Sequence, residues 1–276
     1  MNWITGEDFQ NLGEFTYAPK IKAVGDYNNL PNTLNINLLK EGSIVYTHTV
    51  YAKYLLDIIQ NQDKRVIIIT HNYDWNINNT YIFPDNVIKW FAQNVNVINS
   101  KIESIPIGLE NRWWFIEIQK KEKMLNKLNS PKILRNLVYV NYNIKNNLAK
   151  RIVPYELLKN KSYATIKYGL NGQMFDEYLE DIYDHKFVIC PEGNGIDTHR
   201  TWECLYMNTI PIEKRNINNQ FYTDLPICFV DDWEEINETF LENEYVRIKN
   251  IEWNLDKLDF NYWKNKIISS KEKINE

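Results

Sequence analysis

The stretch from Glu192 to Glu203, EGNGIDTHRTWE, holds residue types that can bind an anion. Its glycines, Gly193 and Gly195, allow a ligand to approach the backbone closely, and the helix predicted after them offers unpaired N–H groups at its start. In the first turn of that helix, the guanidinium of Arg200 can hold two phosphate oxygens. Glu203 follows on the same helix face, where its carboxylate can accept both hydroxyls of a ribose. The spacing therefore predicts a phosphate and ribose site. An ordinary ion pair between Arg200 and Glu203 is the alternative interpretation.

Such a site needs a strand before the loop and a helix after it, and the sequence supplies both. Residues 186–192, KFVICPE, predict a buried strand, and residues 198–208, THRTWECLYMN, predict a helix that Asp197 or Thr198 can cap. In open α/β sheets, ligands bind outside the carboxyl ends of the strands. The glycine loop lies at such an end.

Short apolar runs alternate with longer helical patterns along the chain, which predicts parallel sheets flanked by helices. The predicted strands are 43–47, 65–70, 95–100, 137–142, 162–168, 186–192, 209–213 and 226–231. The predicted helices are 50–60, 146–159 with a break at Pro154, 174–184, 198–208, 233–248 and 260–274.

A polar, lysine-rich helix at residues 117–132 separates two such series of strands and helices. Because it ends at Ser130-Pro131, we expect a domain boundary there, with a first α/β domain over 1–132 and a second over 133–255. A cleft between two α/β domains is the expected place for a ligand.

The composition restricts the class of protein. With 276 residues, 44% hydrophobic and 25% charged, the chain is typical of globular proteins, and its net charge of −4 gives no support to a nucleic-acid or anionic-membrane partner. No apolar run approaches the length of a membrane span, so we expect a soluble, cytoplasmic protein. Cys190, Cys204 and Cys228 form no CxxC pair, which favours buried thiols over a zinc site. No Gly-x-Gly-x-x-Gly follows the first predicted strand, which argues against a dinucleotide-dependent oxidoreductase.

The order of motifs in the second half resembles that of the exostosin-like glycosyltransferases. The matching residues are FVICPEG at 187–193, Arg200, Glu203 and NTIPI at 208–212. Weaker matches are ITHNYD at 69–74, IPIGLEN at 105–111, VYVNYNIKNNLAKR at 138–151 and NYWKNKI at 261–267. The chain departs from the family pattern at Cys204, where alanine is usual, at Asn208, where glycine is usual, and at Glu213, where an apolar residue is common. The last departure bears on the shape of the loop that follows.

The resemblance implies a GT-B fold, in which two Rossmann-like α/β domains face a cleft. The donor would bind to the C-terminal domain, and a last helix within 256–276 would pack back on the N-terminal, acceptor-side domain. In that family the arginine meets the donor diphosphate and the glutamate meets the ribose. The residues expected around the donor are Arg200, Glu203, Glu192, Gly193, Asn194, Gly195, Thr198, Asn141 and Arg151. For Arg151, a solvated place on its helix is the alternative.

The activity implied is transfer of a sugar, with inversion, from a nucleoside-diphosphate sugar to a glycan or other hydroxyl acceptor. A UDP-sugar is the favoured donor. The alternatives are a fucosyltransferase-like enzyme that uses GDP-fucose, and a non-catalytic protein of the same fold that binds nucleotide sugars or glycans. No Asp-x-Asp motif is present, and Asp231-Asp232 is interpreted as a helix start, so we expect no metal or other cofactor.

Inverting transfer needs a base that takes the proton of the acceptor hydroxyl. The candidates follow predicted strands or loops of the first half: Asp74, His71, His48 and Glu110. Asp74 and His71 are favoured because both lie in the ITHNYD match, whereas a hydrogen-bonded loop anchor is the alternative for each histidine. Tyr73, Trp75 and Trp113 are the expected acceptor contacts, since aromatic faces stack on sugars, with core packing as the alternative.

Overall fold

The structure is a computed structural model that describes residues 1–18, 34–111, 117–168 and 175–272. The chain divides into two compact units. Unit 1 comprises Met1–Phe115, Gly195–Asp197 and Asp256–Glu276, and unit 2 comprises Ile116–Asn194 and Thr198–Leu255. Among the described residues there are eight α-helices and two five-stranded sheets, both fully parallel, which confirms the α/β class. The lysine-rich helix lies in unit 2, whereas we expected the boundary after it.

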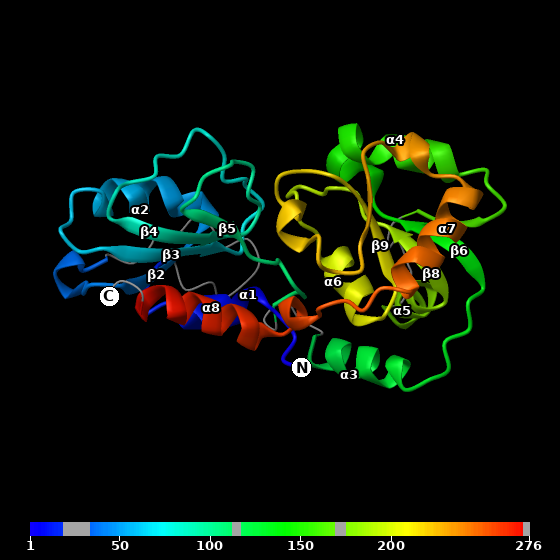
Figure 1. The fold of residues 1–276 in the computed structure, drawn as a ribbon, viewed down its shortest axis with the longest axis horizontal. Coiled ribbons are helices and arrows are strands. Elements are labelled where there is room, and N and C mark those ends of the chain that lie inside the picture. The colour runs from blue at the N-terminus through cyan, green and yellow to red at the C-terminus, as the bar shows by residue number, and fades with distance from the viewer. Residues whose placement is uncertain (19–33, 112–116, 169–174, 273–276) are drawn as a thin grey trace. The chain divides into compact units, whose positions relative to one another are not determined.

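The sheet of unit 1 has the strand order β1-β2-β3-β4-β5. Its strands are β1 (Phe15–Tyr17), β2 (Ser43–His48), β3 (Val66–His71), β4 (Val87–Ala92) and β5 (Ile102–Ser104). All six residues of β2 and of β3 are buried, because α2 (Ala52–Ile59) lies on one face of the sheet and α1 (Gly6–Leu12) on the other (Figure 1). Cover on both faces explains why these two strands are continuous apolar runs in the sequence.

The fourth strand of unit 1 corrects one prediction. Residues 95–100 do not form a strand; Val95 makes only an isolated bridge with Ile77, and the fourth strand is β4 instead. Asn94, with a φ of 59°, turns the chain just after β4. Lys89 breaks the apolar pattern of β4, and its ammonium lies 3.7 Å from the carboxylate of Glu103 on β5. Because Lys89 interrupts the apolar run, the sequence pattern did not predict β4.

The first and last described helices of the chain pack together in unit 1. Thr5 and Asp8 form a capping box at the start of α1, and α8 (Phe260–Glu272) lies beside α1. The Phe9 ring of α1 meets the Phe260 ring of α8 edge-on at 5.4 Å, and the Phe260 amide donates to the carbonyl of Asn2 at 2.8 Å. Unit 1 is therefore built from both ends of the chain.

The sheet of unit 2 has the order β10-β9-β8-β6-β7. Its strands are β6 (Asn136–Asn141), β7 (Ala164–Lys167), β8 (His185–Ile189), β9 (Ile210–Lys214) and β10 (Cys228–Val230). From β6 the chain passes outward to β7, then returns across β6 to β8 and continues to β9 and β10. The strand order thus reverses between β6 and β8. In doubly wound sheets, a crevice opens at such a reversal, outside the carboxyl ends of the two strands.

The helices of unit 2 are α3 (Glu117–Leu128), α4 (Leu148–Leu158), α5 (Phe175–Tyr183), α6 (His199–Tyr206) and α7 (Glu238–Lys249). The break predicted at Pro154 is wrong, because α4 runs through that residue. Proline removes one helix hydrogen bond, but Arg151, Pro154 and Leu158 are all buried on one face of α4, and this packing offsets the loss.

The helix start predicted at residue 233 is also wrong. Asp232 caps a separate 3-10 turn, and α7 begins later, after the cap Asn237.

None of the helices in the described ranges has both the length and the apolar character needed to cross a membrane.

Candidate functional site

The candidate site lies at the carboxyl ends of β6 and β8 in unit 2. Asn141 is the last residue of β6, and Tyr142 follows it. The loop after β8 contains Gly193 and leads to α6, which carries Arg200. The structure therefore brings the predicted anion-binding residues to the reversal of the strand order, where doubly wound sheets bind ligands.

Two arginines face one tyrosine ring at this place. The guanidinium carbon of Arg151, on α4, lies 5.7 Å from the centre of the Tyr142 ring, and that of Arg200 lies 5.9 Å from it. Arg151 donates through Nε to the carbonyl of Glu192 and through Nη1 to the carbonyl of Asn143, both at 2.9 Å. Within the part of the chain that the structure describes, neither guanidinium has a carboxylate within ion-pair distance. Two positive charges are thus held close together on one tyrosine ring.

Burial makes the environment of Arg151 costly for a positive charge. Burial, together with the neighbouring charge of Arg200, lowers the pKa of Arg151 to about 10. The Nε of Arg200 is buried and has no hydrogen-bond partner among the described residues, and the same holds for the hydroxyl of Thr198, at the start of α6. Buried polar groups are normally paired, so these atoms suit a bound anion that accepts their hydrogen bonds.

Gly193 makes room for one of the arginines. A Cβ at this position would lie 2.8 Å from Nη2 of Arg151, closer than Cβ atoms normally approach other heavy atoms. The Gly193 carbonyl also accepts a hydrogen bond of 2.7 Å from Nδ2 of Asn147, just before α4. The loop after β8 is therefore fixed to the start of α4 by Asn147 and Arg151.

Glu203 is occupied by protein groups. Its Oε1 lies 3.0 Å from Nζ of Lys120, on α3, and its Oε2 accepts from the hydroxyl of Tyr178, on α5, at 2.7 Å. Burial alone would raise the pKa of Glu203, but Lys120 and the hydrogen bond from Tyr178 lower it to about 2. Only 5% of Glu203 is exposed. The alternative of an ordinary Arg200–Glu203 ion pair does not describe this geometry, since among the described residues Lys120 is the cation at ion-pair distance.

The other expected donor contacts take different places. Glu192 pairs with Lys150 at 3.3 Å, and Asn194 is exposed. Asn141 is buried and donates through Nδ2 to the hydroxyl of Tyr139 at 2.7 Å. Gly195 belongs to unit 1, where an added Cβ would lie 2.6 Å from Nδ2 of Asn94.

Two further positions concern the predicted cap of α6, Asp197, and the carboxyl of Glu213, which departs from the family pattern. Asp197, which we expected could cap α6, instead accepts through Oδ2 from the amide of Ile107 at 2.7 Å. The Glu213 carboxyl accepts from the hydroxyl of Thr201 and from Nδ2 of Asn219, the latter at 3.1 Å. Burial raises the pKa of Glu213, and these two hydrogen bonds accommodate a carboxyl where an apolar residue is common.

Three residues at the site were not predicted from the sequence: Tyr142, Lys120 and Tyr178. Tyr142 closes the predicted strand 137–142, so its place at a strand end gave a signal. Lys120 and Tyr178 gave none, because they reach Glu203 from helices distant in the sequence.

The two histidines of unit 1 differ in their surroundings. His71 is buried; Nε2 lies 3.0 Å from the carbonyl of Pro106, Nδ1 accepts from the Asn72 amide at 2.8 Å, and the Phe9 ring stacks on it at 5.3 Å. This is the geometry of a loop anchor. His48 is fully buried, and among the described residues neither ring nitrogen has a hydrogen-bond partner. Burial, with a smaller effect of His71, lowers the pKa of His48 to about 4.

The ITHNYD and IPIGLEN matches meet around Asn72. Its Oδ1 accepts from Nδ2 of Asn111 at 2.9 Å, its Nδ2 donates to the Tyr46 hydroxyl at 2.8 Å, and its φ is 58°. A Cβ at Gly6 would lie 1.9 Å from the same Oδ1, so α1 can start here only with glycine. The two matches thus form one hydrogen-bonded structure.

The other candidate bases and acceptor contacts of unit 1 that the structure describes are more exposed than the two histidines. Asp74 is exposed, and Glu110 is partly exposed. The Tyr73 and Trp75 rings meet edge-on at 5.4 Å, and 54% of Trp75 is exposed, which leaves an aromatic surface open to a ligand. Trp113 lies outside the described residues.

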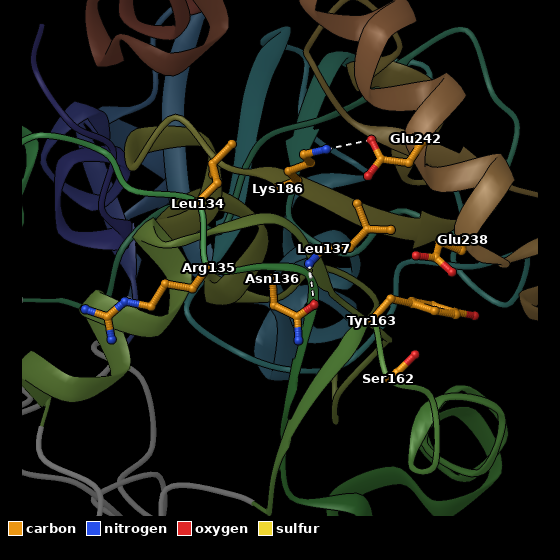
Figure 2. Close-up of a pocket in the computed structure, with 9 residues that line it drawn as sticks. All are labelled: Leu134, Arg135, Asn136, Leu137, Ser162, Tyr163, Lys186, Glu238 and Glu242. Atoms are coloured by element: carbon orange, nitrogen blue, oxygen red, sulfur yellow. Dashed lines mark hydrogen bonds and ion pairs between the residues drawn. The ribbon is translucent and has the colours of Figure 1, made fainter.

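A hollow lies at the opposite end of these strands in unit 2, near the amino ends of β6 and β8 (Figure 2). Its volume is about 320 Å³, and its lining residues are Leu134, Arg135, Asn136, Leu137, Ser162, Tyr163, Lys186, Glu238 and Glu242. Lys186 and Glu242 bind each other across it at 2.6 Å, and Arg135 binds Asp184 at 2.9 Å. Because its cations already have anionic partners, this hollow offers less to an anion than the carboxyl ends do.

No cluster of three or more His, Cys, Asp or Glu side chains suited to a metal ion occurs within the described ranges. Comparison of the chain with known proteins gave no matching family model and no matching curated protein.

The buried imidazole of His48 should make unit 1 sensitive to acid. A histidine whose pKa is lower in the folded than in the unfolded protein binds fewer protons when folded, so stability falls as the pH falls from about 6.5 to 4. We expect this group to cost about 3 kcal/mol of unfolding free energy over that range. In urea denaturation, His48→Phe should therefore lose less stability than the parent between pH 6.5 and 4. Equal losses in the two proteins would contradict the assignment.

Gly193→Ala should displace the guanidinium of Arg151 while leaving the fold intact, because the atom in conflict is the end of a flexible side chain. We expect pyrophosphate to bind about tenfold more weakly by calorimetric titration, the effect of losing one charge-assisted contact. Asn160→Ala, at an exposed position outside the expected donor contacts, is the control and should bind as the parent does. Unchanged binding in Gly193→Ala would show that Arg151 does not contact the anion.

Proposed function

We propose that this protein is a glycosyltransferase of the GT-B type that transfers a sugar from a nucleoside-diphosphate sugar, preferably a UDP-sugar, to a hydroxyl acceptor. The observation that carries the proposal is the pair of guanidinium groups, Arg151 and Arg200, at the carboxyl ends of β6 and β8, where no carboxylate of the described residues lies within ion-pair distance of either. A diphosphate is an anion of matching charge. The resemblance of this segment to the exostosin-like enzymes supports the same donor class.

The two arginines would act on the leaving group. When the bond between the sugar and the diphosphate breaks, negative charge grows on the diphosphate, and fixed positive groups stabilise the transition state more than the bound donor. Arg200 offers its unpaired Nε, and the hydroxyl of Thr198 lies at the start of the same helix. This arrangement supplies positive charge from side chains, so the proposed transfer needs no metal.

Unit 1 would supply the base and the acceptor contacts. Of the four candidate bases, Asp74 has an exposed side chain, whereas His71 is held at both ring nitrogens and His48 is fully buried. Asp74 is therefore the favoured base. Its neighbours Tyr73 and Trp75 present aromatic rings on which a sugar acceptor could stack.

A non-catalytic protein that binds nucleotide sugars is the second candidate. The burial of Glu203 under Lys120 and Tyr178 favours it, because an enzyme with this donor site would be expected to offer that carboxylate to the ribose. Slow release of free nucleotide from a bound donor separates the two candidates: the enzyme releases it, and the binding protein does not.

Arg200→Ala should lower nucleotide release from UDP-sugars more than it weakens UDP binding, since the leaving-group charge is largest in the transition state. For binding, we expect a loss of about tenfold or more in calorimetric titration. The control is Arg247→Ala, which removes an exposed arginine paired with Glu244.

The choice of donor is tested with the same titrations. UDP should bind the parent more tightly than GDP, and a preference for GDP would favour the fucosyltransferase-like alternative. If the parent bound neither nucleotide nor pyrophosphate, the assignment of the site would be wrong.

A further inference from the structure

One face of α3 carries lysines that pair with a row of acidic residues. Lys123 Nζ lies 2.9 Å from Oδ2 of Asp176, and Lys127 Nζ lies 3.5 Å from Oε1 of Glu180 and 3.9 Å from Oδ1 of Asp184. These lysines are four residues apart, and so share a helix face. The acidic residues have the same spacing, along α5 and just beyond it. The two helices are therefore aligned by complementary charges.

Lys120 lies on the same face of α3 and forms an ion pair with Glu203. The Lys120 ammonium lies 3.0 Å from the carboxylate and 4.8 Å from the centre of the Phe175 ring, with 7% of the residue exposed. Among the side chains described in α3, Met124 is fully buried, whereas 43% of Leu125 is exposed. Among the described side chains of α3, the buried Met124 and the ion pairs to α5 and Glu203 thus hold the helix in place.

Glu203 is closed to a ligand in this arrangement. Each of its carboxylate oxygens already has a protein partner, and only 5% of the residue is exposed. Because the carboxylate is buried beneath these two partners, a ribose can reach it only if one of them moves, and Lys120 lies on a helix whose other ion pairs are partly exposed. Because Lys120 is fixed on α3, its displacement moves α3 or loosens it.

We propose that α3 is a latch over the nucleoside end of the site, closed by Lys120 on Glu203 and by Lys123 and Lys127 on the acidic row. This inference rests on the proposed function, since it takes Glu203 as the ribose contact. A ligand with a diphosphate and a ribose opens the latch, whereas a diphosphate alone binds at Arg151 and Arg200 and leaves it closed. The free energy needed to open the latch weakens the binding of the nucleotide, but it leaves the binding of pyrophosphate unchanged.

Hydrogen exchange of the parent protein tests the latch. With saturating UDP, we expect the amides of residues 120–128 to exchange about threefold or more faster than with saturating pyrophosphate, because the population of open α3 rises. Equal or slower exchange with UDP would overturn the proposal while leaving the proposed donor site intact. Failure of both ligands to bind would instead overturn the donor site and the latch with it.

Variants provide an independent measurement. Lys123→Ala combined with Lys127→Ala weakens the latch without touching Glu203 or Lys120, so UDP should bind roughly two- to tenfold more tightly while pyrophosphate affinity is unchanged. Lys121→Ala, an exposed lysine of the same helix, is the matched control and should bind UDP as the parent does. Unchanged or weaker UDP binding in the double variant would refute the latch.

Discussion

The candidate site depends on two guanidinium groups, Arg151 and Arg200, that have no carboxylate of the described residues within ion-pair distance. Arg151 and Arg200 share the Tyr142 ring, and the charge of Arg200 adds to the effect of burial in lowering the pKa of Arg151. Backbone carbonyls of Asn143 and Glu192 accept from Arg151, which satisfies part of its hydrogen bonding but none of its charge. An arrangement that costs folding free energy persists where the surrounding structure holds it firmly. Here the loop at Gly193 and the helix α4 hold it.

The two sheets differ in strand order, and this difference bears on where a ligand is expected to bind. In unit 1 the strands follow one another in sequence order across the sheet, so the order has no reversal. In unit 2 the order reverses between β6 and β8, and both arginines come from the helices that follow these two strands. Topology therefore favours unit 2 as the place of a ligand crevice, independently of residue type. The hollow in Figure 2 lies at the other ends of the same strands, where charged side chains bind each other.

Strands with both faces buried were predictable from the sequence, and so was the loop that leads to the helix of Arg200. β2, β3 and β8 are nearly uniform apolar runs because helices or neighbouring layers leave few of their side chains in water. β4 was missed because Lys89 finds Glu103 on the adjacent strand, a pairing that only the folded sheet creates. The continuity of α4 through Pro154 likewise depends on tertiary packing. Glu203 illustrates the same limit at the site, since no local pattern indicates that Lys120 will cover it.

The assembly of unit 1 from distant segments has a consequence for biosynthesis. Its sheet is made early in translation, but α8, which covers α1 through the Phe9–Phe260 contact, leaves the ribosome only after all of unit 2 has been made. Most of unit 2 is continuous and can collapse as it emerges. The nascent sheet of unit 1 must therefore wait with part of its apolar surface uncovered, and this is the interval in which chaperones would be needed.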